Sequence, residues 1–264
     1  MDAISSVLGS LAGVVVGYAL HWLNEKRSRA RLEFDNELYF EPFKDSVRVS
    51  ARIKHAGGKL PATNVIGLLT VETHSIQLSE LAVGKENSEC RFKNLCKKCG
   101  GRTYLASEKA EVKDEPLPWS IPINAGSGLN GIRYAHLTHI PLGGSSLLRL
   151  FDVYRAKLYG VSVHGEPQEL KDEFWLVKIH SEYGVESYPR ICLRIPVKRS
   201  NIELHLVIRV AGENVKEVVQ DEVILKSENG DCIVEHHGRL HFLHRYFKAM
   251  NVKPLKMSHK ILIR

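Results

Sequence analysis

The sequence predicts a mainly β fold: an antiparallel β-sandwich, preceded by a single N-terminal transmembrane helix and followed by a short C-terminal basic helix. Three features predict it, namely an uncharged run near the start, short alternating segments in the middle and a cationic stretch at the end. A chain of 264 residues, 44% of them hydrophobic, is long enough to bury its own core. The predicted divisions are a transmembrane anchor at 1–25, a sandwich domain at 26–235 and a basic amphipathic tail at 236–264.

The first predicted element is the uncharged run. No charged side chain interrupts the 21 residues from Ala3 to Leu23, and a helix of that length, at about 1.5 Å per residue, crosses the roughly 30 Å hydrocarbon core of a bilayer. A cleaved signal peptide is one alternative, but it needs a positively charged start and a shorter apolar run. A helix buried in the protein is another, although packing gives no reason for the basic cluster that follows the run.

The residues around this run predict its orientation. Lys26, Arg27, Arg29 and Arg31 follow it, whereas only Asp2 and the amino terminus precede it. Cationic flanks stay on the cytoplasmic side of a membrane. We therefore expect a single-pass protein of the lipid bilayer, with its N-terminus outside and its main domain in the cytoplasm.

A stripe of small residues on the same helix predicts helix packing. Ser5, Gly9, Gly13 and Gly17 recur at every fourth position and so share one face. Helices in lipid associate by close backbone packing, which small residues permit. Homo-oligomerisation through this stripe is one interpretation, and the ordinary abundance of glycine in membrane helices is the other.

The middle of the chain has the alternation typical of β-strands. In the segment 47–54, Val47, Val49, Ala51 and Ile53 alternate with charged or polar residues, which predicts one buried and one solvated face. Short strands bounded by turn residues, without intervening amphipathic helices, favour an antiparallel sandwich. The other predicted strands are 65–72, 147–154, 174–180, 191–195, 202–210 and 218–225.

Three stretches carry a resemblance: VRVSARIKHAGGKLPATNVIGLLTVE, then LPWSIP, then LLRLFDVYR. With them the chain resembles a group of uncharacterised membrane-anchored prokaryotic proteins, archaeal ones among them. It is also similar, more distantly, to immunoglobulin-like, adhesion-related domains. The resemblance covers most of residues 31–225 and implies a sandwich that binds a partner, without implying an activity or a catalytic residue.

Residues 75–144 break the alternating pattern and are predicted to form an irregular insertion. They contain a cysteine-bearing stretch, the proline-rich EPLPWSIP and the glycine-rich NAGSGLNG. Long irregular connections often carry function, so a binding surface is expected there.

The cysteine-bearing stretch is the candidate metal site. Cys96 and Cys99 flank two lysines and precede two glycines, so both thiolates can reach one tetrahedral zinc ion, with Cys90 as a third ligand. The candidates for a fourth ligand are Cys192, Cys232 and His74. Structural zinc is one interpretation, and a disulfide or redox pair and inert thiols are the others. No cofactor besides zinc is expected.

The C-terminal stretch holds seven cations and no acidic residue after position 235, which equals the net charge of +7 of the whole chain. It predicts a basic amphipathic helix whose Arg239, Arg245 and Lys248 contact an anionic surface. That surface is predicted to be a membrane leaflet, a protein partner or nucleic acid, of which nucleic acid is the least favoured. The alternative is a terminal helix that packs its apolar face, Leu240, Leu243, Phe247 and Met250, on the sandwich.

The sequence contains no nucleophile elbow, P-loop or HExxH zinc motif. The favoured function is therefore that of a membrane-tethered, non-enzymatic binding or scaffolding protein. The first alternative is a membrane-anchored enzyme, or a zinc-stabilised domain, built around Cys90, Cys96 and Cys99. The second is nucleic-acid binding by the basic tail.

Overall fold

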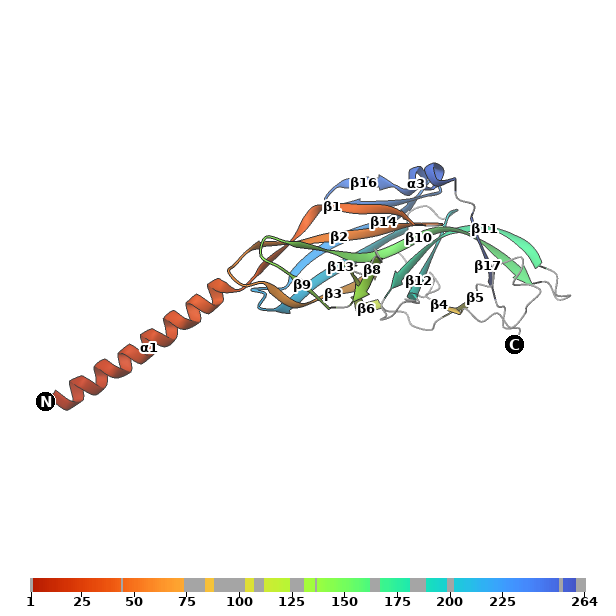
Figure 1. Cartoon of the computed structure of the whole chain (residues 1–264). Helices are drawn as coiled ribbons and strands as arrows, with labels where there is room; N and C mark the ends of the chain where they lie inside the picture. The colour runs from red at the N-terminus through yellow and green to blue at the C-terminus, as the bar shows by residue number, and fades with distance from the viewer. Residues whose placement is uncertain are drawn as a thin grey trace.

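The prediction of a mainly β fold is confirmed: in the computed structural model two β-sheets pack together, and one long helix projects from them (Figure 1). That helix, α1, extends over Asp2–Ser28. The structure describes residues 2–43, 45–73, 84–87, 103–106, 112–123, 131–135, 137–161, 167–180, 189–198, 202–251 and 254–259.

The first sheet has ten strands within these ranges, in the order β1–β2–β10–β11–β12–β4–β5–β17, with β7 on β10 and β8 on β7. Its pairs are antiparallel, except that β17 runs parallel to β10 and to β5. The strands are β1 (Arg31–Phe43), β2 (Ser46–Gly57), β4 (Gly84–Asn87), β5 (Thr103–Ala106), β7 (Trp119–Ile123), β8 (Gly131–Ala135), β10 (Ser145–Val161), β11 (Pro167–His180), β12 (Pro189–Pro196) and β17 (Leu255–His259).

The second sheet has seven strands within the described ranges, in the order β16–β15–β14–β13–β3–β6, with β9 on β3. All its pairs are antiparallel. The strands are β3 (Ala62–Thr73), β6 (Val112–Leu117), β9 (Leu137–Ile140), β13 (Ile202–Glu213), β14 (Val219–Glu228), β15 (Asp231–His236) and β16 (Arg239–Phe242).

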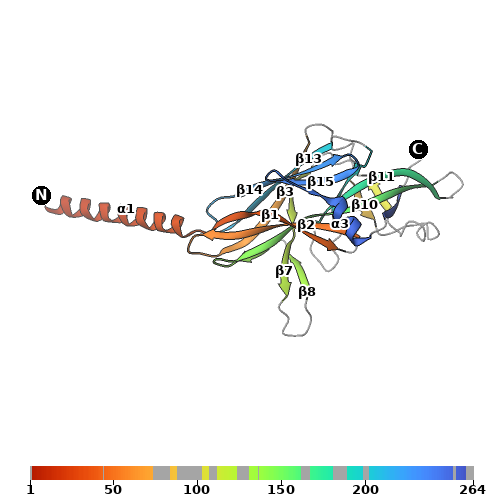
Figure 2. The ribbon, with the colours of Figure 1, turned by 90° about the horizontal axis from the view of Figure 1, so that it is seen from above.

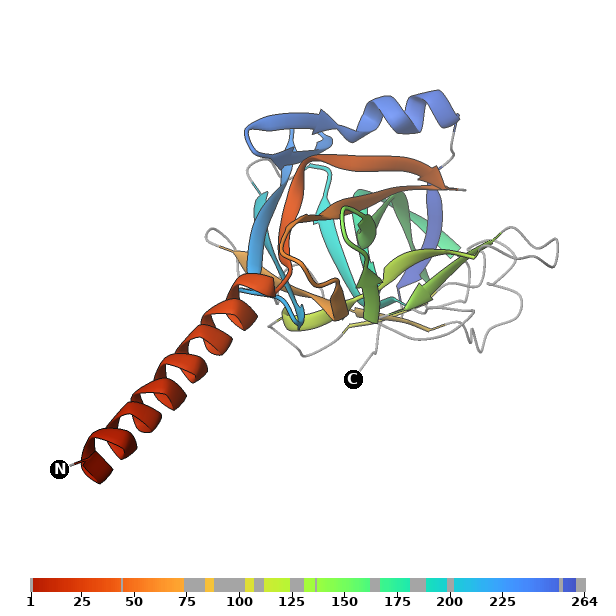
Figure 3. The same cartoon turned by 60° about the vertical axis from the view of Figure 1, so that its left-hand side comes forward.

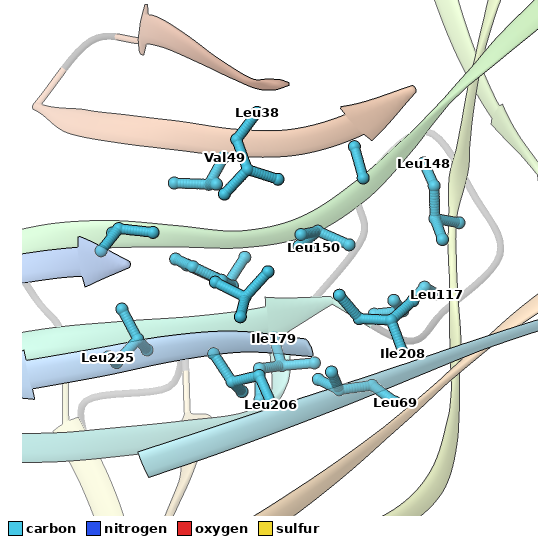
Figure 4. Packing of buried hydrophobic residues seen from close by; sticks show 14 of the residues in the cluster. Leu38, Val49, Leu69, Leu117, Leu148, Leu150, Ile179, Leu206, Ile208 and Leu225 are labelled. Atoms are coloured by element: carbon cyan, nitrogen blue, oxygen red, sulfur yellow. The ribbon is translucent and has the colours of Figure 1, made fainter. Parts of the chain in front are cut away.

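The hydrophobic core lies between the two sheets (Figure 4). Val49 and Leu150 come from the ten-stranded sheet, and Leu69, Leu206 and Ile208 come from the seven-stranded sheet; each is at most 1% exposed. Burial of apolar area on both inner faces, at roughly 25 cal/mol per Å², is the main force that holds the sheets together. Because the apolar residues alternate along each strand, each strand contributes one apolar face to the core between the sheets.

The strands predicted in the middle of the chain are confirmed within β2, β3, β10, β11, β12, β13 and β14, except that the last begins at Val219 instead of Val218. Sequence reasoning missed β1, because charged residues recur along Arg31–Phe43 and only Leu32 and Leu38 are buried. β1 pairs with β2 from Arg31 to Phe43, with irregularities between Arg31 and Leu32 and between Phe34 and Leu38. Pairing with a neighbour, rather than its own pattern, makes this segment a strand.

The prediction of a solvated outer face on β2 is wrong near its start. Arg48 is 4% exposed and Ser50 is 7% exposed, so both faces of the strand are covered there. Burial is possible because Arg48 meets the carboxylate of Asp152 on the neighbouring strand β10, with 3.3 Å between Nε and Oδ1. The outer face becomes solvated only further along, where Lys54 is exposed.

The predicted irregular insertion at 75–144 contains regular structure in its described parts. Strands β4 to β9 fall inside it, and β6 and β9 extend the seven-stranded sheet. β7 and β8 form a hairpin that projects from the sandwich (Figure 2). The proline-rich and glycine-rich composition concealed these short strands.

The prediction of a short C-terminal helix is confirmed as α3 (Leu243–Met250), with a corrected start. The segment before it, Arg239–Phe242, is the strand β16, so Leu240 lies on a strand and is 51% exposed. Leu243 and Phe247 of α3 are buried, and α3 lies over the edge of the sandwich (Figure 3). The chain then returns as β17 to the ten-stranded sheet.

Candidate functional site

Helix α1 carries large apolar side chains into solvent. Val15 is 64% exposed, Tyr18 is 75% exposed and Leu20 is 61% exposed, and these residues point to different sides of the helix. Figures 1 and 3 both show α1 extending away from the sheets. Among the described residues, the part of α1 from Val15 to Leu23 therefore presents an exposed apolar surface, which is the kind of surface that contacts a partner molecule.

The described side chains of α1 begin at Val15, whereas the apolar run of the sequence begins at Ala3. Within the described part of the chain, no helix combines the length and the hydropathy of a membrane span.

Backbone hydrogen bonds fix the end of α1 to two turns of the β domain. The amides of Lys59 and Leu60 both donate to the carbonyl of Ser28, at 2.9 Å. The amide of Ala30 donates to the carbonyl of Asn214 at 2.6 Å, and the amide of Lys216 donates to the carbonyl of Ala30 at 2.8 Å. These bonds hold the helix end in a defined place on the β domain.

Each of three turns at this end of the β domain exposes one apolar side chain. Leu60 is 38% exposed, Leu142 is 56% exposed and Val218 is 59% exposed. The turn with Leu142 joins the others because the amide of His55 donates to the carbonyl of Gly144 at 2.9 Å, while the His55 ring contacts the carbonyl of Leu60. We call Leu60, Leu142 and Val218 the helix-proximal rim.

Charged side chains accompany the helix-proximal rim. Lys59 directly precedes Leu60, and Lys216 lies two positions before Val218; both lysines are exposed, as is Glu217. Arg29 pairs with Glu25 of the preceding helical turn, at 3.4 Å. The helix-proximal rim thus combines exposed apolar side chains with charged neighbours of both signs.

The predicted small-residue stripe lies entirely within α1. Ser5, Gly9, Gly13 and Gly17 keep their four-residue spacing on a continuous helix, so they share one face. A Cβ added at Gly17 would meet nothing within 4 Å, so this position is open to a neighbour. Helix packing through the stripe stays a prediction.

The predicted metal ligands Cys90, Cys96 and Cys99 lie outside the described residues, as does His74. Cys232 is buried and unbonded, and its burial raises the pKa of its thiol far above the usual range. The structure places Cys232 in the hydrophobic core, on β15. Its role as a fourth zinc ligand stays a prediction.

The three predicted surface cations have separate environments. Arg239 on β16 pairs with Glu37 of β1 at 2.7 Å. Arg245 on α3 lies 5.4 Å from the centre of the Phe242 ring, and Lys248, one turn later on α3, lines an open cavity. Contact of these residues with an anionic surface stays a prediction.

The cavity beside α3 has a volume of about 400 Å³. Its lining includes Arg155, Trp175, His244 and Lys248. The Trp175 side chain packs on Phe247, and its buried indole nitrogen has no hydrogen-bond partner in the described part of the protein. The cavity thus combines cationic side chains with an aromatic wall.

The cations of this cavity are partly neutralised. Arg155 donates to Glu173 at 2.8 Å, and hydrogen bonds from Arg155 and Lys157 lower the pKa of the Glu173 carboxyl below its usual value. His244 is hydrogen-bonded to Asp231. These pairs leave Lys248 as the lining cation for which no ionic partner is seen among the described residues.

A second cluster of ionisable groups was missed by sequence reasoning. Asp221, His236 and His237 bring one ligand atom each within 4.8 Å of one another. The adjacent histidines are visible in the sequence, but nothing local indicates that a carboxylate 15 positions earlier faces them. Hairpin pairing of β14, β15 and β16 creates the cluster.

Comparisons with protein-family models, with curated proteins and with solved structures find no match for the chain. A proposal for the function of the chain therefore rests on its own sequence and structure.

Proposed function

We propose that the chain is a membrane-tethered, non-enzymatic binding or scaffolding protein. The observation that carries this proposal is α1: a helix with exposed apolar side chains, projecting from a β domain that leaves those side chains uncovered. The uncharged run that begins at Ala3 supplies the length for a span. In this proposal α1 crosses the bilayer once.

The charges around α1 support an orientation with the N-terminus outside and the β domain in the cytoplasm. Lys26 and Arg27 occupy the last turn of α1, and Lys26 lies 5.1 Å from the centre of the Trp22 ring. An aromatic ring beside a cation is typical of a membrane interface, and cationic flanks remain cytoplasmic.

The helix-proximal rim also supports the tether. Leu60 and Val218 lie in the two turns that are hydrogen-bonded to the helix end, and the turn with Leu142 is bonded to the first of these, so a bilayer that contains α1 would lie close to all three. Exposed apolar side chains at loop tips have no stabilising role in water, whereas insertion below the headgroups buries them. In this proposal, insertion of the rim side chains gives the β domain a preferred orientation on the membrane surface.

The β domain is the proposed binding part. Two packed, mainly antiparallel sheets are an architecture shared by immunoglobulin-like adhesion domains, an analogy of fold that suggests binding without establishing it. The cavity beside α3 and the projecting β7–β8 hairpin are surfaces on which a macromolecular partner can dock. Both are built from elements other than α1, so they stay available when α1 is in lipid.

The test is membrane extraction combined with site-specific labelling of the full chain in cells. The full chain is expected to resist carbonate washing and to dissolve only with detergent. In Asp2→Cys the new thiol is expected to react with an impermeant maleimide in intact cells, whereas in Lys216→Cys it reacts only after permeabilisation.

The unaltered chain, with its own five cysteines, is the control for background labelling. Release of the protein by carbonate would contradict the tether. Labelling of Lys216→Cys in intact cells would contradict the orientation alone.

A further inference from the structure

We infer that Asp221, His236 and His237 form a binding site for a divalent transition-metal ion of the zinc class. The Nε2 atom of His236 lies 2.8 Å from Oδ2 of Asp221, and the Nε2 atom of His237 lies 3.4 Å from Oδ1 of the same carboxylate. Zinc binds nitrogen and oxygen at about 2.0–2.2 Å, so two ligands at a tetrahedral angle stand roughly 3.4 Å apart. Both separations are at or below that value, and the three ligand atoms lie within 4.8 Å of one another, so small side-chain adjustments would let them hold one ion.

The turn between β15 and β16 aims both histidines at one carboxylate. Consecutive side chains of a strand point to opposite faces, so two adjacent histidines on a straight strand cannot share a ligand. Here His236 ends β15, while His237 with φ +48° and Gly238 with φ +75° form the two-residue turn. Positive φ at both turn positions is the type I′ geometry, which fits the twist of the hairpin. The left-handed backbone at His237 therefore brings its ring beside that of His236, 4.1 Å away between ring centres.

Burial holds two of the three ligands in place. The His236 side chain is 2% exposed and that of Asp221 is 7% exposed, whereas that of His237 is 49% exposed. Asp221 is fixed within β14, opposite Ile208 of β13. A site with two rigid inner ligands and one outer ligand loses little conformational entropy when an ion binds.

The outer side of the cluster opens into a cavity of about 420 Å³. Glu222 and Glu235 line it together with Asp221 and His237. Glu222 is engaged by His205 at 2.6 Å, and Glu235 is engaged by Lys226 at 2.7 Å. An ion held by the three ligands keeps a coordination position toward this cavity for water or another small ligand.

An ordinary ion pair accounts for the geometry less well. A single histidine is sufficient to form an ion pair with an aspartate, as His244 does with Asp231 elsewhere in the chain. At Asp221 a second imidazole, half exposed and with solvent available to it, turns to the same carboxylate. Two imidazoles and one carboxylate form a ligand set typical of zinc and of other first-row divalent ions.

The experiment uses the full chain in detergent, stripped with a chelator and titrated with zinc chloride by calorimetry. Cobalt is the spectroscopic probe. Thiolate ligands give bound cobalt intense near-ultraviolet bands, so the spectrum distinguishes this site, which has no cysteine, from any site formed by cysteines. The wild-type chain is expected to bind one ion without thiolate bands and to gain thermal stability.

The decisive variant is His237→Asn. Asparagine tolerates the left-handed backbone of the turn, so the hairpin is kept while the outer ligand is removed. Zinc affinity is expected to fall on the order of tenfold or more, with loss of the zinc-dependent rise in Tm. The matched control, His244→Gln, removes a histidine from a two-residue pair and should leave zinc binding unchanged.

Three outcomes would overturn the inference. They are absence of zinc binding by the wild-type chain, equal affinity in wild type and His237→Asn, and cobalt binding seen only through thiolate bands. The measurement is independent of the membrane tether, because it follows the ion and not the location of the chain.

Discussion

Asp152 is a buried carboxylate that serves two arginines at the outer face of the ten-stranded sheet. The side chain is 1% exposed, and it accepts hydrogen bonds from Nε of Arg48 and Nε of Arg149, each at 3.3 Å. Lys178 is the register partner of Asp152 on β11, and its ammonium group lies 4.6 Å from the centre of the Tyr154 ring. Charges removed from water in this way depend on their partners, because burial without pairing is very costly.

We therefore expect Asp152→Asn to destabilise the fold strongly. Removal of one partner from a buried ion pair costs about 3–5 kcal/mol, and here it leaves two arginines facing a neutral amide. Urea unfolding followed by tryptophan fluorescence measures the free energy of unfolding.

The matched control is Asp114→Asn, which neutralises a half-exposed aspartate paired with Arg209 at 3.0 Å. Asp114 has φ +51°, a backbone conformation that asparagine adopts readily. Its cost should stay below about 1 kcal/mol, the usual range for surface pairs. Equal losses in the two variants would show that burial of Asp152 has no special energetic role.

At the scale of elements, the end of α1 and the β2–β3 turn touch through a glycine. Gly58 has φ +97°, and a Cβ placed on it would lie 2.2 Å from the carbonyl oxygen of Arg29 and 3.0 Å from Cα of Ala30. Those atoms belong to backbone and cannot rotate away. The close approach also allows the amides of Lys59 and Leu60 to reach Ser28.

Gly58→Ala is accordingly expected to separate this turn from the helix end and to lower the Tm of the β domain. Gly143→Ala is the matched control, since Gly143 also has positive φ, at +66°, but a Cβ there meets nothing within 4 Å. A left-handed alanine costs about 1–2 kcal/mol in either place, so the excess loss in Gly58→Ala measures the steric contact. Comparable Tm values for both variants would contradict the importance of the contact.

At the scale of the whole molecule, α1 joins one end of the sandwich and α3 lies further along it (Figure 1). The turns of the helix-proximal rim are hydrogen-bonded to the residues where α1 ends or to one another. If the rim sits on the bilayer, a photoreactive benzophenone amino acid at Val218 should crosslink to lipid after reconstitution of the full chain. The same residue placed at Leu240 on β16, which is similarly exposed at 51%, should not. Mass spectrometry of the lipid adducts provides the measurement, and equal crosslinking at both positions would remove the rim from the proposal while leaving the tether in place.

Features that depend on local pattern could be predicted from the sequence. Alternation at Val47, Val49, Ala51 and Ile53 predicts a strand and its buried face, and burial of all four confirms both. The uncharged run predicts the helix that the structure has over Asp2–Ser28. Backbone geometry explains this success, because a period of 2 or 3.6 residues decides which side chains share a face without reference to the rest of the chain.

Features that depend on which strands become neighbours were decided by the tertiary structure alone. Arg48 and Asp152 are 104 positions apart, and they meet because β2 pairs with β10. Asp221 meets His236 and His237 only because two successive hairpins fold β14, β15 and β16 together, and the helix-proximal rim needs three separate turns at one end. Strand pairing uses backbone hydrogen bonds, which nearly all residues can form, so the alternating pattern of a strand does not determine which strand pairs with it. The pairing is determined by how the two sheets pack around one core.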